Sequence, residues 1–174
     1  MATISGGDKL NKVLLELATR VSNPGTLRVG FLEGATYPDT KPTKLRAQYA
    51  KRKAKGVEGA IKGSAGGTSV AMIAAIQEFG APSRGIPPRP FFRNMIAAKS
   101  PEWPDAIGKL LVANKYDATK TLKMAGEAIA GQLRESITTF VGPGLKPATI
   151  KRKGFSKELI DSGHLLASVD YSVD

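Results

Sequence analysis

The sequence predicts an α+β fold: a small antiparallel sheet packed with several helices, including one long helix in the C-terminal half, plus an inserted basic arm. Three observations lead to this prediction. Helical periodicity recurs in separate segments, strand-like alternation occurs in two places, and a basic Gly/Lys-rich stretch interrupts both patterns. The 174 residues, 41% of them hydrophobic, can bury one sizeable core. We therefore expect a single domain over residues 1–174, with residues 40–67 as the arm.

The first expected element is an amphipathic helix that Asp8 can cap and that ends at Asn23-Pro24-Gly25. Its apolar residues recur at the spacing of one helical face, which we expect to pack in the core: Leu10, Val13, Leu14, Leu17 and Val21. Residues 27–32 then alternate as a strand does. Val169, Tyr171 and Val173 alternate with polar residues in the same way, so this second strand can pair with the first.

The remaining elements that the sequence predicts are helices. Thr68 can cap a helix over SVAMIAAIQEF that stops at Gly80, and this helix is apolar nearly all round, which is typical of a buried helix. Pro90 fits the first turn of a short helix, PFFRNMIAAK. Another helix is expected over residues 105–113 and a long one over residues 117–140. The long helix carries an apolar stripe: Leu122, Ala125, Ile129, Leu133, Ile137 and Phe140.

Charge is the strongest feature of the composition. The formal net charge is +11 and the isoelectric point is about 10.0, so polyanions are natural partners. Residues 40–67 alone hold eight basic residues and one acidic residue, and their few large apolar residues cannot build a core. The arm therefore concentrates the excess charge.

The residues argue against an enzyme, and we expect no catalytic residue, cofactor or metal site. No cysteine is present, and the one histidine, His164, excludes two-histidine metal sites. Asp161, Ser162 and His164 lie within one tight turn, where a triad geometry is hardly attainable, so we assign Asp161 and Gly163 to a structural turn. GSAGG lacks the lysine-serine ending of a phosphate loop and is typical of a flexible hinge. With no membrane-spanning run and no signal peptide pattern, we expect a soluble protein that is not exported by the usual signal.

Residues 77–94, QEFGAPSRGIPPRPFFRN, hold four prolines, three arginines and three phenylalanines. Prolines lower the entropy cost of holding one extended shape, and aromatic rings offer large contact area. One hypothesis is a rigid subunit or partner contact over residues 81–93. The alternative is local core: Phe91 and Phe92 are buried, and the prolines only turn the chain between two helices.

Three pieces read in order resemble the tail-completion and head–tail joining proteins of long-tailed bacteriophages and prophages. These pieces are IQEFGAPSRGIPPRPFFRNMI, the helix containing GEAIAGQLRESI, and LKPATIKRKGFSKELIDSGHLLASVDYSV. LRVGFLEGATYP is similar to the opening strand of the same family. The hallmark pair is E-F-G followed by R-P-F, at residues 78–80 and 89–91, together with L-I-D-S-G-H-L at residues 159–165. The resemblance covers nearly the whole chain except residues 40–67.

The resemblance implies a structural virion protein without chemistry. Such proteins complete the tail end or join the tail to the head connector, as subunits of a ring, commonly six-fold, around the DNA channel. The implied partners are copies of the chain itself, the tail tube or tail terminator, and head connector proteins, with no membrane partner. The implied location is the virion tail or neck, with assembly in the host cytoplasm. The expected subunit or partner contacts are Glu78, Phe79, Arg84, Arg89, Pro90, Phe91, Phe92 and Arg93.

The arm departs from the family pattern, so only its physical chemistry can be interpreted. One hypothesis is contact with DNA phosphates in the channel, another is docking onto acidic partner proteins, and a third is a solvated loop. The candidate contacts are Lys44, Arg46, Lys51, Arg52, Lys53 and Lys55. The alternative function is a small basic nucleic-acid-binding protein, which fits the charge but leaves the E-F-G and R-P-F pieces unexplained.

Overall fold

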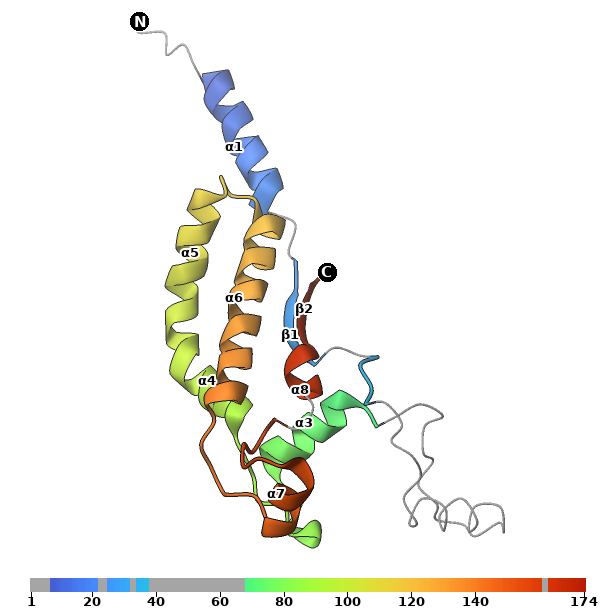
Figure 1. The fold of residues 1–174 in the computed structure, drawn as a ribbon. Helices are drawn as coiled ribbons and strands as arrows, with labels where there is room; N and C mark the ends of the chain where they lie inside the picture. The colour runs from blue at the N-terminus through green and yellow to red at the C-terminus, as the bar shows by residue number, and fades with distance from the viewer. Residues whose placement is uncertain (1–6, 22–24, 32–33, 38–67, 161–162) are drawn as a thin grey trace, which may run out of the picture. The chain divides into compact units, whose positions relative to one another are not determined.

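The computed structural model describes residues 7–21, 25–31, 34–37, 68–160 and 163–174 (Figure 1). These residues form a mixed helix and sheet structure, which confirms the predicted α+β class. The predicted basic arm, residues 40–67, lies outside the described residues. The chain divides into two compact units. Unit 1 comprises residues 1–30, 91–139 and 169–174, and unit 2 comprises residues 31–90 and 140–168.

Unit 1 is a helical layer with a two-stranded sheet on one helix. Its elements are α1 (Gly7–Val21), β1 (Leu27–Phe31), α4 (Phe91–Lys99), the 3-10 turn η2 (Ser100–Glu102), α5 (Trp103–Ala113), α6 (Ala118–Thr139) and β2 (Val169–Val173). Figure 1 shows α5 beside α6, and β2 packs on α6. The expected helices at 105–113 and 117–140 are confirmed, with α5 beginning two residues earlier. The short helix α4 begins at Phe91, so Pro90 precedes it instead of occupying its first turn.

The sheet joins the two strands that the sequence predicts. β1 and β2 are the neighbouring strands of a two-stranded antiparallel sheet. At its end the Thr26 N–H donates to the Asp174 carbonyl at 3.0 Å, and the Asp174 N–H donates to the Thr26 carbonyl at 3.1 Å. This reciprocal pair confirms that the strands pair and sets their register. An exposed ion pair between Arg28 and Asp174 closes the same end.

The long helix α6 carries the core of unit 1. Its buried residues are Thr121, Ala125, Gly126, Ala130, Leu133 and Ile137. Three members of the predicted stripe, Ala125, Leu133 and Ile137, are thus confirmed. Leu122 and Ile129 are only half-buried, and Phe140 lies beyond the last residue of the helix. The buried face of α6 is thus centred on Ala125, Gly126 and Ala130 instead of Leu122 and Ile129, because these small residues let the sheet approach the helix closely. A Cβ on Gly126 would lie 2.5 Å from the Tyr171 ring and 2.8 Å from Leu27.

Hydrogen bonds from side chains tie the other elements of unit 1 to α6. Arg134 donates from Nη2 to the Val169 carbonyl at 2.8 Å. Ser136 Oγ donates to the Phe91 carbonyl at 2.7 Å, which holds the start of α4. Trp103 donates from Nε1 to Gln132 Oε1 at 2.9 Å, which holds the start of α5. One helix therefore positions both neighbouring helices and the sheet.

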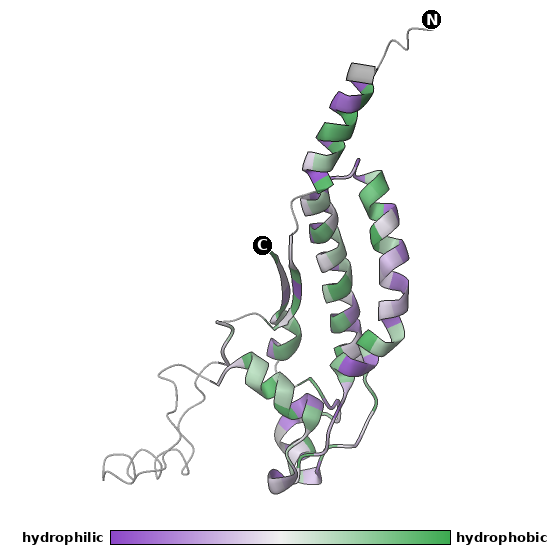
Figure 2. Cartoon of the chain, turned by 180° about the vertical axis from the view of Figure 1, so that it is seen from behind, coloured by the Kyte–Doolittle hydropathy of each residue, from purple (hydrophilic) through white to green (hydrophobic). Residues whose placement is uncertain are grey.

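The prediction that one face of the first helix packs in the core is wrong. Most of the apolar face of α1 is exposed in the chain: Leu10 by 62%, Val13 by 51%, Leu14 by 52% and Val21 by 49%, while Leu17 is half-buried. The helix begins at Gly7, so Asp8 lies inside its first turn and not at the cap position. A described contact of α1 is at its C-terminal end, where Arg20 donates to the Lys115 carbonyl at 3.4 Å. Figure 1 shows α1 continuing past the ends of α5 and α6, and Figure 2 shows apolar residues interspersed along it.

Unit 2 is built from short helices and the proline-rich segment. Its elements are α3 (Val70–Phe79), the 3-10 turn η1 (Pro82–Arg84), α7 (Pro147–Lys153) and α8 (His164–Ala167). Ser69, and not Thr68, stands at the N-cap of α3. The expectation that α3 is buried on all sides is wrong, because only Val70, Ala74 and Glu78 are buried. Met72 and Phe79 are exposed by 60% and 64%. High mean hydropathy predicted burial, but unit 2 covers only one face of the helix.

Glycine ends α3 as predicted. Gly80 has φ of 76° and ψ of 177°, a conformation that essentially only glycine adopts. A Cβ at this position would also lie 2.8 Å from the Pro88 nitrogen and 2.9 Å from the Ile86 carbonyl oxygen. Ala81 and Ile86 then form an antiparallel bridge across η1. The chain therefore reverses directly after α3, and this reversal brings residues 86–89 back along the helix.

Candidate functional site

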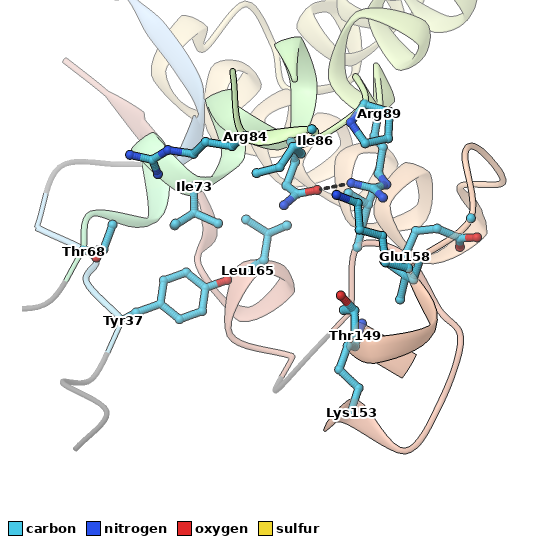
Figure 3. Close-up of a pocket in the computed structure, with 17 residues that line it drawn as sticks. Tyr37, Thr68, Ile73, Arg84, Ile86, Arg89, Thr149, Lys153, Glu158 and Leu165 are labelled. Atoms are coloured by element: carbon cyan, nitrogen blue, oxygen red, sulfur yellow. Dashed lines mark hydrogen bonds between the residues drawn. The ribbon is translucent and has the colours of Figure 1, made fainter. Parts of the chain in front are cut away.

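A pocket of about 540 Å³ lies in unit 2, between the returning proline-rich segment and residues 144–159 (Figure 3). The first wall comes from α3 and residues 84–89, and the second comes from α7 and the segments on either side of it. Tyr37, Thr68 and Leu165 complete the lining. All of these residues belong to one compact unit, so the pocket is a property of unit 2 alone.

Arg89 is the buried cation of this pocket, with only 5% of its surface exposed. Its backbone N–H donates to the Gln77 carbonyl at 2.7 Å, and its Nη1 donates to Gln77 Oε1 at 2.8 Å. Its Nη2 donates to the Pro143 carbonyl at 3.4 Å. The Nε–H is buried and has no hydrogen-bond partner among the described residues. The guanidinium therefore retains one unused donor in a place that water hardly reaches.

Burial lowers the pKa of Arg89 below its ordinary value, and the nearby Glu158 carboxylate opposes this shift. A lowered arginine pKa still leaves the side chain protonated at neutral pH. The structure thus holds a positive charge away from solvent. In this buried position an anionic partner additional to Glu158 would interact strongly with the guanidinium.

The rim of the pocket adds further positive charge. Arg84 and Lys146 are exposed and Lys153 is half-buried, so with Arg89 four basic side chains line the pocket together with one carboxylate, that of Glu158. Lys146 Nζ would lie 3.0 Å from a Cβ on Gly85, which places this ammonium beside the η1 turn. Lys153 is engaged locally: its Nζ donates to the Lys157 carbonyl at 2.6 Å and lies 4.7 Å from the Phe155 ring centroid. The remaining wall is largely apolar, from Ile73, Ile86, Leu145, Leu159 and Leu165.

The structure separates the predicted contact residues of the proline-rich segment into three groups by burial. Glu78, Arg89 and Phe91 are buried, with exposures of 4%, 5% and 1%. Pro90 and Phe92 are half-buried, while Phe79, Arg84 and Arg93 are exposed. For Phe91 the burial favours the alternative of local core packing. A role for the exposed members in subunit or partner contact stays a prediction.

His164 is placed as a structural residue. Its Nε2 lies 2.9 Å from the Thr36 carbonyl, so the Nε2-protonated tautomer donates there, and its ring lies 4.7 Å from the Tyr37 ring. Gly163, which was assigned to a structural turn, has a left-handed conformation with φ of 76° and stands at the N-cap of α8. Asp161 and Ser162 lie outside the described residues, as do the candidate arm contacts Lys44, Arg46, Lys51, Arg52, Lys53 and Lys55.

Within the described ranges, no group of three or more His, Cys, Asp or Glu residues is arranged to hold a metal ion. Among the helices that the structure describes, none has the length and apolar character needed to cross a bilayer. The pocket itself presents donors and apolar surface, with Glu158 as its one lining carboxylate. The excess of basic side chains in this lining suits binding of an anionic group.

Sequence reasoning missed the second wall of the pocket. Lys151, Arg152 and Lys153 form a basic cluster whose simplest interpretation is a solvated helix face, and the exposed Lys151 fits that interpretation. Lys153 instead turns into the pocket lining. A usable signal was present: Lys146 and Lys153 are seven residues apart, which returns to nearly the same side of a helix.

Comparisons with protein-family models, curated proteins and solved structures found no match to this chain.

Proposed function

We propose that this chain is a structural virion protein that completes the tail end of a long-tailed phage or joins the tail to the head connector, as a subunit of a ring around the DNA channel. The motifs at residues 78–80, 89–91 and 159–165 support the proposal through their resemblance to that family. In this role the chain performs no chemistry and takes no cofactor. Its site of action is the virion neck, after assembly in the host cytoplasm.

The observation that carries the proposal is the exposed apolar face of α1. Four of its side chains are about half exposed or more: Leu10, Val13, Leu14 and Val21. A soluble monomer rarely leaves such a stripe uncovered, because each large apolar side chain contributes about 1.5–3 kcal/mol when it is fully buried. A neighbouring protein that covers the stripe therefore stabilises the chain considerably.

The chemistry of α1 favours a second copy of the same chain as the covering partner. Lys9, Lys12 and Arg20 share the helix with Glu16, so its charged residues carry both signs. A partner of strong single-sign charge gains little from such a surface, whereas a copy can offer complementary pairs. If α1 packs on a different surface of the next copy, the contact is heterologous and closes into a ring when its rotation permits.

Electron microscopy of a phage with a stop codon in this gene tests the proposed role. We expect full heads and separate or over-long tails, and a plasmid copy should restore joined particles. Over-long tails would assign the chain to tail completion, and normal unattached tails would assign it to the joint. Joined, normal particles in the absence of the protein would overturn the proposal.

The alternative, a small basic nucleic-acid-binding protein, is favoured by one observation, the eight basic residues among residues 40–67. Phosphate contacts release counterions, so such binding weakens steeply as salt rises. Salt-dependent retention on DNA that disappears when residues 41–62 are deleted would support this function. Retention that survives the deletion would contradict it.

A further inference from the structure

We propose that the pocket of unit 2 binds the carboxylate side chain of an acidic, apolar segment of a partner protein. The pocket belongs to unit 2 alone and the inference uses none of the family resemblance, so it stands whether or not the chain acts in a phage neck. The inference goes beyond that role because it assigns a ligand chemistry to a defined cavity.

The first step is the unused donor of Arg89. The side chain is 95% removed from solvent, yet its Nε–H has no partner among the described residues, while Nη1 and Nη2 are both engaged. A buried donor without an acceptor carries a large desolvation cost, and native structures usually satisfy such groups. An incoming oxygen acceptor would remove this cost. Nη1 and Nη2 each already donate one hydrogen bond, so Nε is the buried donor atom that lacks an acceptor, and a charge-assisted hydrogen bond from it would satisfy that atom.

The second step is the charge around that donor. Four basic side chains and one carboxylate line the pocket, a formal charge of +3. This excess attracts an anionic group, which a carboxylate or a phosphate could supply. The choice between the two depends on the rest of the lining.

The third step is the apolar part of the lining. Leu159 and Leu165 are buried, and Ile73, Ile86 and Leu145 are half-buried around the same cavity (Figure 3). A free inorganic anion would leave this surface uncovered. A protein segment in which an aspartate or glutamate lies between apolar residues covers it and places the carboxylate beside the basic side chains.

Arg84 and Lys146 are the residues through which the pocket is best tested. Both are exposed, so their replacement leaves the fold intact, and both line the cavity. Lys151 is a matched control, because it is an exposed lysine of α7 that does not line the pocket. Arg89→Lys is a second variant that keeps the charge and removes the Nε–H; its circular dichroism spectrum checks that it folds.

The experiment is an NMR titration of the full chain that follows the Arg89 Nε–Hε resonance. The probe is an acetylated, amidated tripeptide with one glutamate between two leucines, and the control peptide has glutamine in place of glutamate. We expect the glutamate peptide to shift the resonance and the glutamine peptide not to shift it. Arg84→Gln and Lys146→Gln should each weaken binding about 1.5-fold to fivefold, as expected for one lost exposed ion pair, and Lys151→Gln should leave it unchanged.

Three outcomes would overturn the inference. Equal shifts with both peptides would mean that the pocket binds apolar groups without a carboxylate. No shift with either peptide at millimolar concentration would mean that the pocket is not a binding site for such a segment. Tighter binding of inorganic phosphate than of the glutamate peptide would assign the pocket to a phosphate group.

Discussion

Gln77 and Arg89 are joined twice, through backbone and side chain. The Arg89 backbone N–H donates to the Gln77 carbonyl at 2.7 Å, and Arg89 Nη1 donates to Gln77 Oε1 at 2.8 Å. Gln77 belongs to α3, and Arg89 belongs to the proline-rich segment that returns along it. The pair therefore fixes the reversal of the chain and the position of a buried positive charge at the same time.

The first prediction concerns this pair. Gln77→Leu keeps the backbone bond and removes the Oε1 acceptor, which leaves a second nitrogen of the buried guanidinium, Nη1, without its hydrogen-bond acceptor. We expect the free energy of unfolding to fall by about 1–3 kcal/mol, the cost of an unsatisfied buried donor. Urea denaturation followed by circular dichroism measures it. Lys151→Gln, at an exposed site of the same unit, should change stability by less than about 0.5 kcal/mol. Equal effects of the two substitutions would show that the Gln77–Arg89 bond contributes nothing.

The second prediction compares two glycines of α6. A Cβ on Gly126 would lie 2.5 Å from the Tyr171 ring, whereas nothing lies within 4 Å of a Cβ on Gly131. Gly131→Ala should therefore stabilise the protein by about 0.5–1 kcal/mol, because alanine restricts the unfolded chain and favours the helix. Gly126→Ala should destabilise it by about 1–3 kcal/mol, because the sheet must move away. Thermal unfolding of both variants measures the difference. Stabilisation by both would mean that β2 does not pack on α6 as described.

The third prediction concerns α1 and self-association. Leu14 lies on the apolar face with Leu10 and Val21, while Leu15 is also exposed but points to another side of the helix. Leu14→Glu should reduce self-association about tenfold or more, because it places a charge in the proposed contact. Leu15→Glu should leave self-association nearly unchanged. Light scattering after gel filtration measures both. If the two variants behave alike, the contact does not use this face of α1.

The fourth prediction tests the structural role of His164. His164→Phe keeps a ring beside Tyr37 and loses the hydrogen bond to the Thr36 carbonyl. The expected loss is about 0.5–1.5 kcal/mol in the free energy of unfolding, typical of one hydrogen bond. Denaturation curves should shift while the oligomeric state stays the same. A variant with unchanged stability would remove His164 from the list of groups that hold α8.

The elements that the sequence predicted well are those with a long or unambiguous pattern. Ala118–Thr139 is a 22-residue helix whose periodicity is visible over several turns, and β1 and β2 alternate cleanly. Burial was harder to predict. The stripe of α1 and the apolar composition of α3 both indicated core, yet Leu14 and Phe79 are exposed. Periodicity identifies an apolar face but does not say whether the same chain covers it.

The pocket could not be predicted from the sequence either, and the reason differs from that for the burial of α1 and α3. Its two walls, at residues 84–89 and 144–159, are far apart in the chain and meet only through tertiary packing. The arginine at position 89 was predicted to be a subunit or partner contact of a stiff segment, whereas the structure buries it. Proline and arginine content predicted stiffness and charge there but not the side of the segment that faces inward.

The strand pairing has a consequence for how the protein is made. β1 and β2 occupy residues 27–31 and 169–173, and residues 31–90 and 140–168 of unit 2 are interleaved with the segments of unit 1. On the ribosome, β1 must therefore remain without its partner strand until all of the intervening chain has emerged. Closing such a long loop is slow, and exposed strand edges invite pairing with other nascent chains. The yield of native protein should consequently depend on how long this interval lasts, so slower translation favours misassembly.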